Sequence, residues 1–169
     1  SSEEVNEAID SLLSTNVTMG RKVAAFERRF ADYLGVRHAV MVNSGSSANL
    51  IALTVLTNPT LSRRIEPGDE VIVPAVAWST TYFPIANVGA LPVLVDVDID
   101  DYTINIEAIK DAITPRTRAI MPVHLMGNPC KMDRIMQIAN ENGLFVIEDS
   151  CEAHGSEFSN RKVGTFGDV

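Results

Sequence analysis

Cysteine and long apolar runs are scarce in this chain, and each shortage excludes a class of protein. Only two cysteines, Cys130 and Cys151, occur among 169 residues, so the chain has no disulfide framework and we expect a reducing, cytoplasmic setting. No apolar run reaches the roughly 18 residues that a transmembrane helix needs. The opening residues are acidic and amphipathic, unlike a signal peptide. We therefore expect no membrane partner.

Positive charge is also scarce. The formal net charge is −8, so the chain lacks the basic surface that attracts nucleic acid or anionic membranes. The fingerprint G-x-G-x-x-G is missing as well, which disfavours a dinucleotide-binding Rossmann module. With 46% hydrophobic and 21% charged residues, the composition is that of a globular domain.

Apolar residues recur at helical spacing near the start, and strand-like and helix-like segments alternate after residue 35. The spacing predicts helices over 3–14 and 22–34, the second ending on Gly35. Val/Ile-rich strands are expected at 38–43, 69–75, 91–98, 118–125 and 144–150, with helices at 46–56, 79–89, 105–113 and 131–143. This alternation predicts an α/β fold: a mostly parallel sheet with helices on both faces.

The same pattern divides the chain into an N-terminal helical segment, residues 1–35, and a sheet domain, residues 36–169. The last residues, "KVGTFGDV", form a turn with no closing helix or strand behind them. We expect the sheet domain to be incomplete at this end and the chain to be the front piece of a longer protein.

In parallel sheets, ligands bind beyond the carboxyl ends of the strands. Three features follow predicted strands here. The turn Ser44–Asn49 opens a helix and offers free backbone N–H groups to an anion. Asp149 ends an apolar strand, either as a helix cap or buried salt bridge or as the partner of a cationic ring nitrogen. Trp78, the only tryptophan, is either core filler or a surface on which a ring stacks. Together the three favour a phosphorylated pyridine such as pyridoxal phosphate (PLP).

Several ordered motifs make the chain resemble the DegT/DnrJ/EryC1/StrS family of PLP-dependent enzymes that act on nucleotide-linked sugars. The motifs are "TMGRKVAAFERRFADYLGVRHAVMVNSGSSANLIAL", "GDEVIVPAVAWSTTYFPIANVGALPVLVDVD", "MPVHLMGNPCKMDRIMQIANENGLFVIEDSCEAHGS" and "KVGTFGD". The resemblance implies the fold of aspartate aminotransferase (fold type I) and part of its PLP-binding large domain. It also implies a homodimer.

The resemblance assigns roles to five residues. Ser46 and Ser47 are expected to bind the cofactor phosphate, Trp78 to stack on the ring, and Asp149 to keep the ring nitrogen protonated. Glu152 stands where aminotransferases of the family usually carry Gln. With "PAVAWSTTY", it looks more like the 4-keto-6-deoxy-sugar 3-dehydratases. It is expected to lie near the ring hydroxyl, unless it is a tolerated substitution.

The implied reaction is C3 deoxygenation of a nucleotide-linked 4-keto-6-deoxy sugar, with glutamate supplying the amine of the pyridoxamine phosphate (PMP) form. Two alternatives stay open: transamination of the same 4-keto group, and a non-catalytic PLP-binding relative. The Schiff-base lysine, or the histidine that replaces it in the dehydratases, is expected after "GTFGD". The four lysines, Lys22, Lys110, Lys131 and Lys162, are expected on solvated helix faces or a surface turn. We therefore expect this chain alone to be inactive.

The histidines and cysteines do not have the spacing of a zinc site. A structural role is expected for His124 and His154. His124 is the better candidate for lining the pocket, because it ends a predicted strand.

Overall fold

The computed structural model describes residues 1–15, 17–18 and 20–169, which fold into two units. The N-terminal unit is Ser1–Met41 and the sheet unit is Val42–Val169. The division falls after Met41, later in the chain than the boundary that the sequence pattern indicates.

Two helices build the N-terminal unit, as predicted: α1, Ser2–Leu13, and α2, Arg21–Leu34. Gly35 ends α2 in the left-handed conformation, with φ of 74°, which glycine adopts without strain. The C-cap prediction is therefore confirmed. None of the helices in the described part of the chain has the length and hydrophobicity that a membrane span requires.

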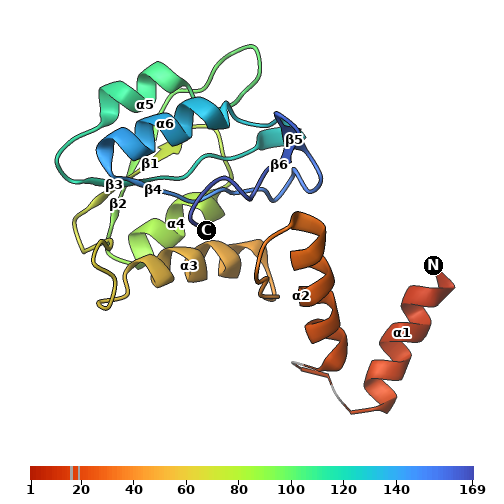
Figure 1. Ribbon diagram of the computed structural model, residues 1–169. Helices are drawn as coiled ribbons and strands as arrows, with labels where there is room; N and C mark the ends of the chain where they lie inside the picture. Colours follow the sequence, from red (N-terminus) through yellow and green to blue (C-terminus); the bar gives the residue numbers. More distant parts are fainter. Residues whose placement is uncertain (16, 19) are drawn as a thin grey trace. The chain divides into compact units, whose positions relative to one another are not determined.

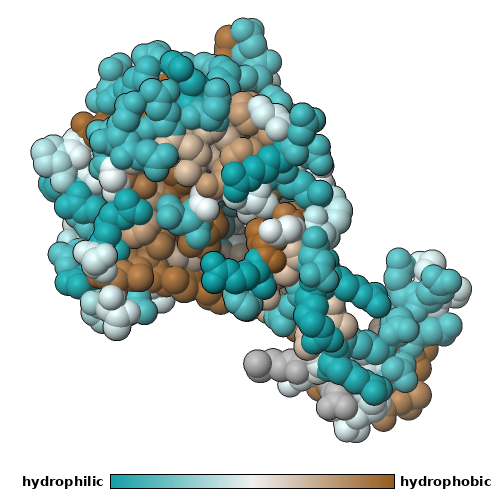
Figure 2. Space-filling view, in the orientation of Figure 1, coloured by the Kyte–Doolittle hydropathy of each residue, from teal (hydrophilic) through white to brown (hydrophobic). Residues whose placement is uncertain are grey.

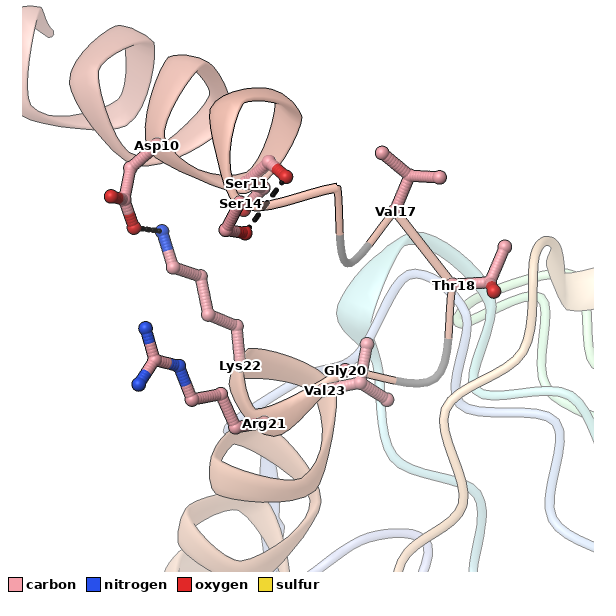
Figure 3. Close-up of a pocket in the computed structure, with 9 residues that line it drawn as sticks. All are labelled: Asp10, Ser11, Ser14, Val17, Thr18, Gly20, Arg21, Lys22 and Val23. Atoms are coloured by element: carbon pink, nitrogen blue, oxygen red, sulfur yellow. Dashed lines mark hydrogen bonds and ion pairs between the residues drawn. The ribbon is translucent and has the colours of Figure 1, made fainter.

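A hollow of about 140 Å³ lies between these two helices (Figure 3). Its cation, Lys22, contacts the carboxylates of Glu7 and Asp10 at 2.5 and 2.9 Å. Hydrogen bonds from both carboxylates raise the pKa of Lys22 above its ordinary value. Lys22 is thus held by neighbours from its own unit, and Arg21 also lines the hollow (Figure 3).

Residues 38–43 do not form the predicted strand. A β-strand exists only where a neighbouring strand accepts and donates its backbone hydrogen bonds. In the described residues no strand pairs with this segment, and the Met41 N–H instead donates to the Glu27 carboxylate at 2.8 Å. An apolar pattern alone therefore gave the wrong element.

The sheet unit contains a four-stranded sheet of order β2-β1-β3-β4, in which every pairing is parallel. The strands are β1 (Glu70–Pro74), β2 (Leu91–Val95), β3 (Thr117–Ile120) and β4 (Phe145–Val146). All four strands are shorter than predicted, β3 and β4 most of all. Pro122 lacks an N–H and interrupts the ladder after β3, beyond which a single bridge joins Val123 to Asp149.

Helices cover both faces of this sheet (Figure 1). Helices α3 (Gly45–Leu56) and α4 (Ser79–Asn87) lie on one face, and α5 (Ile106–Ala112) and α6 (Met132–Asn142) lie on the other. Alternate residues of β1 serve the two cores: Val71 and Val73 pack with Leu53, whereas Ile72 packs with Ile135. The predicted α/β fold with a covered parallel sheet is confirmed.

Helix α6 is followed by β4 and then by a short hairpin of β5 (Glu157–Phe158) and β6 (Arg161–Lys162). The 3₁₀ turn η1 (Leu125–Gly127) follows β3.

Apolar residues, brown in Figure 2, gather over α3, where Ile51 and Val55 are about half exposed. Apolar surface in this unit is therefore not confined to its two cores.

At the amino end of β1, the nearly buried Glu70 carboxylate is saturated with donors. Arg116 donates to it through Nε at 3.0 Å and Nη2 at 2.5 Å, and the Thr114 hydroxyl donates at 2.5 Å. The hydrogen bonds from Thr114 and Arg116 outweigh burial and hold the pKa of Glu70 below its ordinary value. This network ties β1 to the segment before β3.

A depressed folded pKa stabilises the fold at neutral pH, and this contribution is lost as pH falls through the folded value. We expect the free energy of unfolding to decline below about pH 4.3, where an unfolded Glu binds its proton. In Glu70→Gln, denaturant titrations at several pH values should show lower stability at pH 7 and a shallower acid decline. Equal acid declines in the two proteins would contradict the role of Glu70.

Candidate cofactor site

A cavity of about 670 Å³ opens at the carboxyl ends of the strands. Its walls come from the start of α3, the segment joining β1 to α4, the residues after β3 and those after β4. The lining residues are Gly45, Ser46, Asn49, Val76, Ala77, Trp78, Thr80, Thr81, Val123, Leu125, Met126, Asp149, Cys151 and Glu152. This is the edge where a parallel sheet is expected to bind its ligand.

Asp149 is the most constrained residue of the cavity. Its backbone N–H donates to the Pro122 carbonyl at 3.0 Å, and its carbonyl accepts from the His124 N–H at 3.0 Å. Its side chain is buried, with 7% of the residue exposed. Among the ion pairs of the described residues, none includes Asp149, so neither the cap nor the salt-bridge alternative accounts for this buried charge.

Two side chains hold one oxygen of this carboxylate. Asn49 Nδ2 and Thr81 Oγ1 donate to Asp149 Oδ2 at 2.9 and 3.1 Å. The other oxygen, Oδ1, accepts from the Cys151 N–H at 3.2 Å. The Cys151 thiol also hydrogen-bonds to this carboxylate, but a thiol is a weak donor that a cationic ligand can replace.

Asn49 and Thr81 were not assigned a role from the sequence. Both lie in segments that follow predicted strands, so their position was visible, but their common target is far away in the chain. A polar amide on an otherwise apolar helix such as α3 is the one signal that pointed to Asn49.

Replacing either donor should destabilise the carboxylate. We expect Asn49→Leu and Thr81→Val each to lower the free energy of unfolding by about 1.5–3 kcal/mol, the range for hydrogen bonds to charged groups. Urea denaturation at pH 7 measures the loss, with Thr54→Val, on the exposed side of α3, as the matched control. Losses equal to that of the control would contradict this account of the Asp149 environment.

The start of α3 forms one wall of the cavity. Ser44 is the N-cap, and its Oγ accepts from the Ser47 N–H at 3.2 Å. Gly45 and Ser46 line the cavity. Ser47 belongs to the same first turn, but it is not among the lining residues and its N–H serves the cap. The structure thus brings Ser46 to the cavity and places Ser47 behind it.

Trp78 stands at the N-cap position of α4 and is 75% exposed, with its side chain lining the cavity. The core-filler alternative is therefore wrong. An exposed indole at a cavity wall is available for stacking against an aromatic ring.

Glu152 reaches across to the turn after β3. Its Oε2 accepts from the Met126 N–H at 2.6 Å, and Met126 has a positive φ of 55°. Within the described residues, no hydrogen bond involves its second oxygen, Oε1. The charge of Glu152 therefore remains available at the cavity wall.

His124 does not line the cavity: its side chain is 0% exposed and hydrogen-bonds to Glu148, which agrees with the structural role expected for it. Cys151 does line the cavity, but burial and the nearby Asp149 charge raise the pKa of its thiol to about 11. At neutral pH it is a thiol, which is a weak nucleophile. Among the described residues, no three His, Cys, Asp or Glu side chains are placed to hold a metal ion.

All four lysines are described, and none lines the cavity. Lys110 pairs with Glu107 at 2.7 Å and Lys131 with Asp98 at 2.6 Å. These lysines are therefore neutralised at the surface, and the amine for a covalent link to a cofactor does not come from them.

The donor set of the cavity suits a phosphorylated aromatic cation: backbone N–H groups at a helix start, an exposed indole and a buried carboxylate without a Lys or Arg partner among the described residues. Fold and cavity together define an α/β protein with a cofactor site at the carboxyl edge of a parallel sheet. The chain belongs to the DegT/DnrJ/EryC1/StrS aminotransferase family, whose model matches residues 1–169.

Relatives of known name agree with this assignment. The chain is 47% identical over 162 residues to dTDP-4-dehydro-2,6-dideoxy-D-glucose 3-dehydratase of Saccharopolyspora spinosa, covering 95% of this chain and 35% of that protein. It is 45% identical over 161 residues to GDP-4-keto-6-deoxy-D-mannose 3-dehydratase of Escherichia coli O55:H7, covering 95% and 41%. The chain thus spans about two fifths of the length of these relatives.

Among solved structures, GDP-4-keto-6-deoxymannose-3-dehydratase with a trapped PLP-glutamate geminal diamine matches with a TM-score of 0.88 and 44% identity. The match covers 96% of this chain and 42% of that one. The resemblance to the family and the prediction of a fold-type-I large domain are confirmed.

Proposed function

We propose that this chain forms the PLP-binding part of an enzyme that removes the 3-hydroxyl group from a nucleotide-linked 4-keto-6-deoxy sugar. The observation that carries the proposal is the buried Asp149 carboxylate, which lines the cavity and has no Lys or Arg partner among the described residues. The names of the relatives support the reaction, because the two described above are sugar 3-dehydratases.

The residues present fit the cofactor. Ser46 and the backbone N–H groups at the start of α3 would hold its phosphate, with Ser47 shaping that turn through the cap. Trp78 would stack on the ring, and Asp149 would keep a proton on the ring nitrogen. When bound, a pyridoxal cofactor supplies an electron sink for the cleavage of bonds next to an imine carbon.

Glu152 favours dehydration over transamination for a geometric reason. The Met126 N–H requires an acceptor, and it already occupies Oε2. With Glu, the second atom facing the cavity is a carboxylate oxygen, an acceptor that carries negative charge. With Gln, the amide oxygen would take the Met126 N–H, and a donor NH₂ group would face the cavity. Residue 152 thus decides whether this wall presents an acceptor or a donor to a ligand hydroxyl.

Glu152→Gln should therefore separate the two reactions in the full-length enzyme. We expect dehydration to fall by at least about tenfold, which is less than the roughly 100-fold for loss of an acid–base group because Gln keeps the bond to Met126. Thermal stability should stay near that of the wild type, because Gln still accepts from Met126. Mass spectrometry of the sugar product measures the outcome, since a deoxy sugar and an amino sugar differ in composition. Unchanged dehydration would make Glu152 a tolerated substitution.

A second copy of the chain and an amino-acid donor complete the proposal. Exposed apolar side chains line the open cavity, with Val76 46%, Trp78 75% and Met126 81% exposed. A homodimer that covers this surface would exclude water from the site. Glutamate is the proposed amine donor. The cytoplasm is the proposed location, which agrees with Cys130 and Cys151 being free thiols.

The test is to incubate the full-length protein with PLP, glutamate and GDP-4-keto-6-deoxymannose. Loss of the 3-hydroxyl group supports the dehydratase, and an amino sugar supports the aminotransferase alternative suggested by the family name. Recovery of unchanged sugar, with PLP bound, would support a non-catalytic relative.

A further inference from the structure

Glu148 is a buried acid that the proposed chemistry does not use. It precedes Asp149 and is not among the residues that line the cavity. Its side chain is 0% exposed, and in the described part of the chain no Lys or Arg pairs with it; its side-chain neighbour is His124. A carboxylate buried without Lys or Arg is costly unless donors surround it.

The donors come from the loop Gly164–Gly167, which follows the β5–β6 hairpin. The N–H groups of Phe166 and Gly167 donate to Oε1 at 2.5 and 2.6 Å. The Gly164 N–H donates to Oε2 at 2.8 Å. Together they form a backbone nest for an anion, filled by a side chain of the same protein. Burial raises the pKa of Glu148, but hydrogen bonds from His124 and this loop outweigh it and hold that pKa below its ordinary value.

His124 is the fourth donor, and its tautomer follows from its contacts. Its Nδ1 accepts from the Cys130 N–H at 3.0 Å, so the ring proton is on Nε2 and donates to Glu148 Oε2 at 3.1 Å. The backbone N–H of His124 donates to the Asp149 carbonyl. His124 therefore connects the two acids: its ring hydrogen-bonds to Glu148, and its backbone N–H donates to Asp149.

We infer that Glu148 and His124 are positioning residues, which fix the backbone of Asp149 so that its carboxylate meets Asn49 and Thr81 at the cavity. This inference rests on the proposed function only for the ligand that Asp149 receives. The geometry also explains why the acid must be Glu. An amide at residue 148 would place its NH₂ group against donors whichever way it is turned, either Gly164 and His124 or Phe166 and Gly167.

The experiment compares Glu148→Gln with wild type by NMR and by binding of PMP, whose amine cannot form an imine with surface lysines. The Asn49 side-chain amide reports its bond to Asp149 without any ligand, and Trp78 fluorescence reports PMP. We expect shifted Asn49 resonances and at least tenfold weaker PMP binding by the folded protein. Glu157→Gln is the matched control, because Glu157 is an exposed acid of the β5–β6 hairpin. It should change neither the Asn49 resonances nor the affinity for PMP.

If Glu148→Gln does not fold, His124→Asn carries the test, because its amide oxygen can still accept from the Cys130 N–H while the donor toward Glu148 is lost. Unchanged Asn49 resonances and PMP affinity, with faster amide exchange in the loop alone, would overturn the inference and leave a purely structural pair. If PMP fails to bind even the wild type, the proposed function fails. The Asn49 resonances would still decide the positioning role.

Discussion

Asp149→Asn should weaken PMP binding by about 30-fold or more, the largest functional effect expected in this chain. Removing one partner of a buried, hydrogen-bonded charge pair costs about 2–5 kcal/mol, and each 1.4 kcal/mol is tenfold in affinity. The substitution keeps the size of the side chain, but it replaces the acceptor at Oδ1 or Oδ2 with a donor. An amide here cannot neutralise a protonated ring nitrogen.

Quenching of the single tryptophan, Trp78, measures this affinity directly. Asp133→Asn is the matched control, because it removes one carboxylate from the exposed first turn of α6, outside the cavity lining. Both variants should unfold as single cooperative transitions, so that affinity is compared between folded proteins. Equal affinity in Asp149→Asn and wild type would show that the ring nitrogen does not meet this residue.

A comparably large effect on stability is expected at Gly167. A Cβ atom added there would lie 2.5 Å from the Val146 carbonyl oxygen of β4, closer than real contacts allow. The obstacle is the backbone of the buried residue Val146 in β4, which cannot move aside as a flexible side chain would. The loop would have to shift, and with it the Gly167 N–H bond to Glu148 and the Asp168 N–H bond to the Val146 carbonyl.

Gly167→Ala should therefore lower the free energy of unfolding by about 1–3 kcal/mol, as overpacking does. For a domain of this size, the melting temperature falls by about 2–4 °C for each kcal/mol. Gly45→Ala is the control, since no atom lies within 4 Å of its added Cβ and its φ is not positive. Calorimetry of both variants decides the question, and a Gly167→Ala protein as stable as Gly45→Ala would refute the close approach.

Helices and their ends followed from the sequence because their causes are local. Asn105, for example, is the N-cap of α5, and its Oδ1 accepts from the Ala108 N–H at 2.9 Å, three residues ahead. The parallel sheet followed from the alternation of strand-like and helix-like segments along the chain. The order of the strands within the sheet, β2-β1-β3-β4, did not. Residues 38–43 did not, because an apolar segment becomes a strand only when another strand lies beside it.

Within the site, residue type was enough to select Trp78 and Asp149, since an exposed indole and a carboxylate ending an apolar strand are conspicuous. It was not enough for Asn49, which meets Asp149 across 100 positions of sequence. Nor did it show Glu148, which binds loop N–H groups that every residue except proline carries. The roles of all five residues toward a cofactor stay predictions: Ser46, Ser47, Trp78, Asp149 and Glu152.

The central claim is that PMP and PLP bind in the cavity at the carboxyl edge of the sheet. Titration of the ¹⁵N-labelled chain with PMP tests it most directly. The account predicts saturable shifts at the Gly45 and Ser46 amides, the Trp78 indole N–H and the Asn49 side-chain amide. Absence of shifts, or shifts that gather around Lys22 in the N-terminal unit, would contradict it.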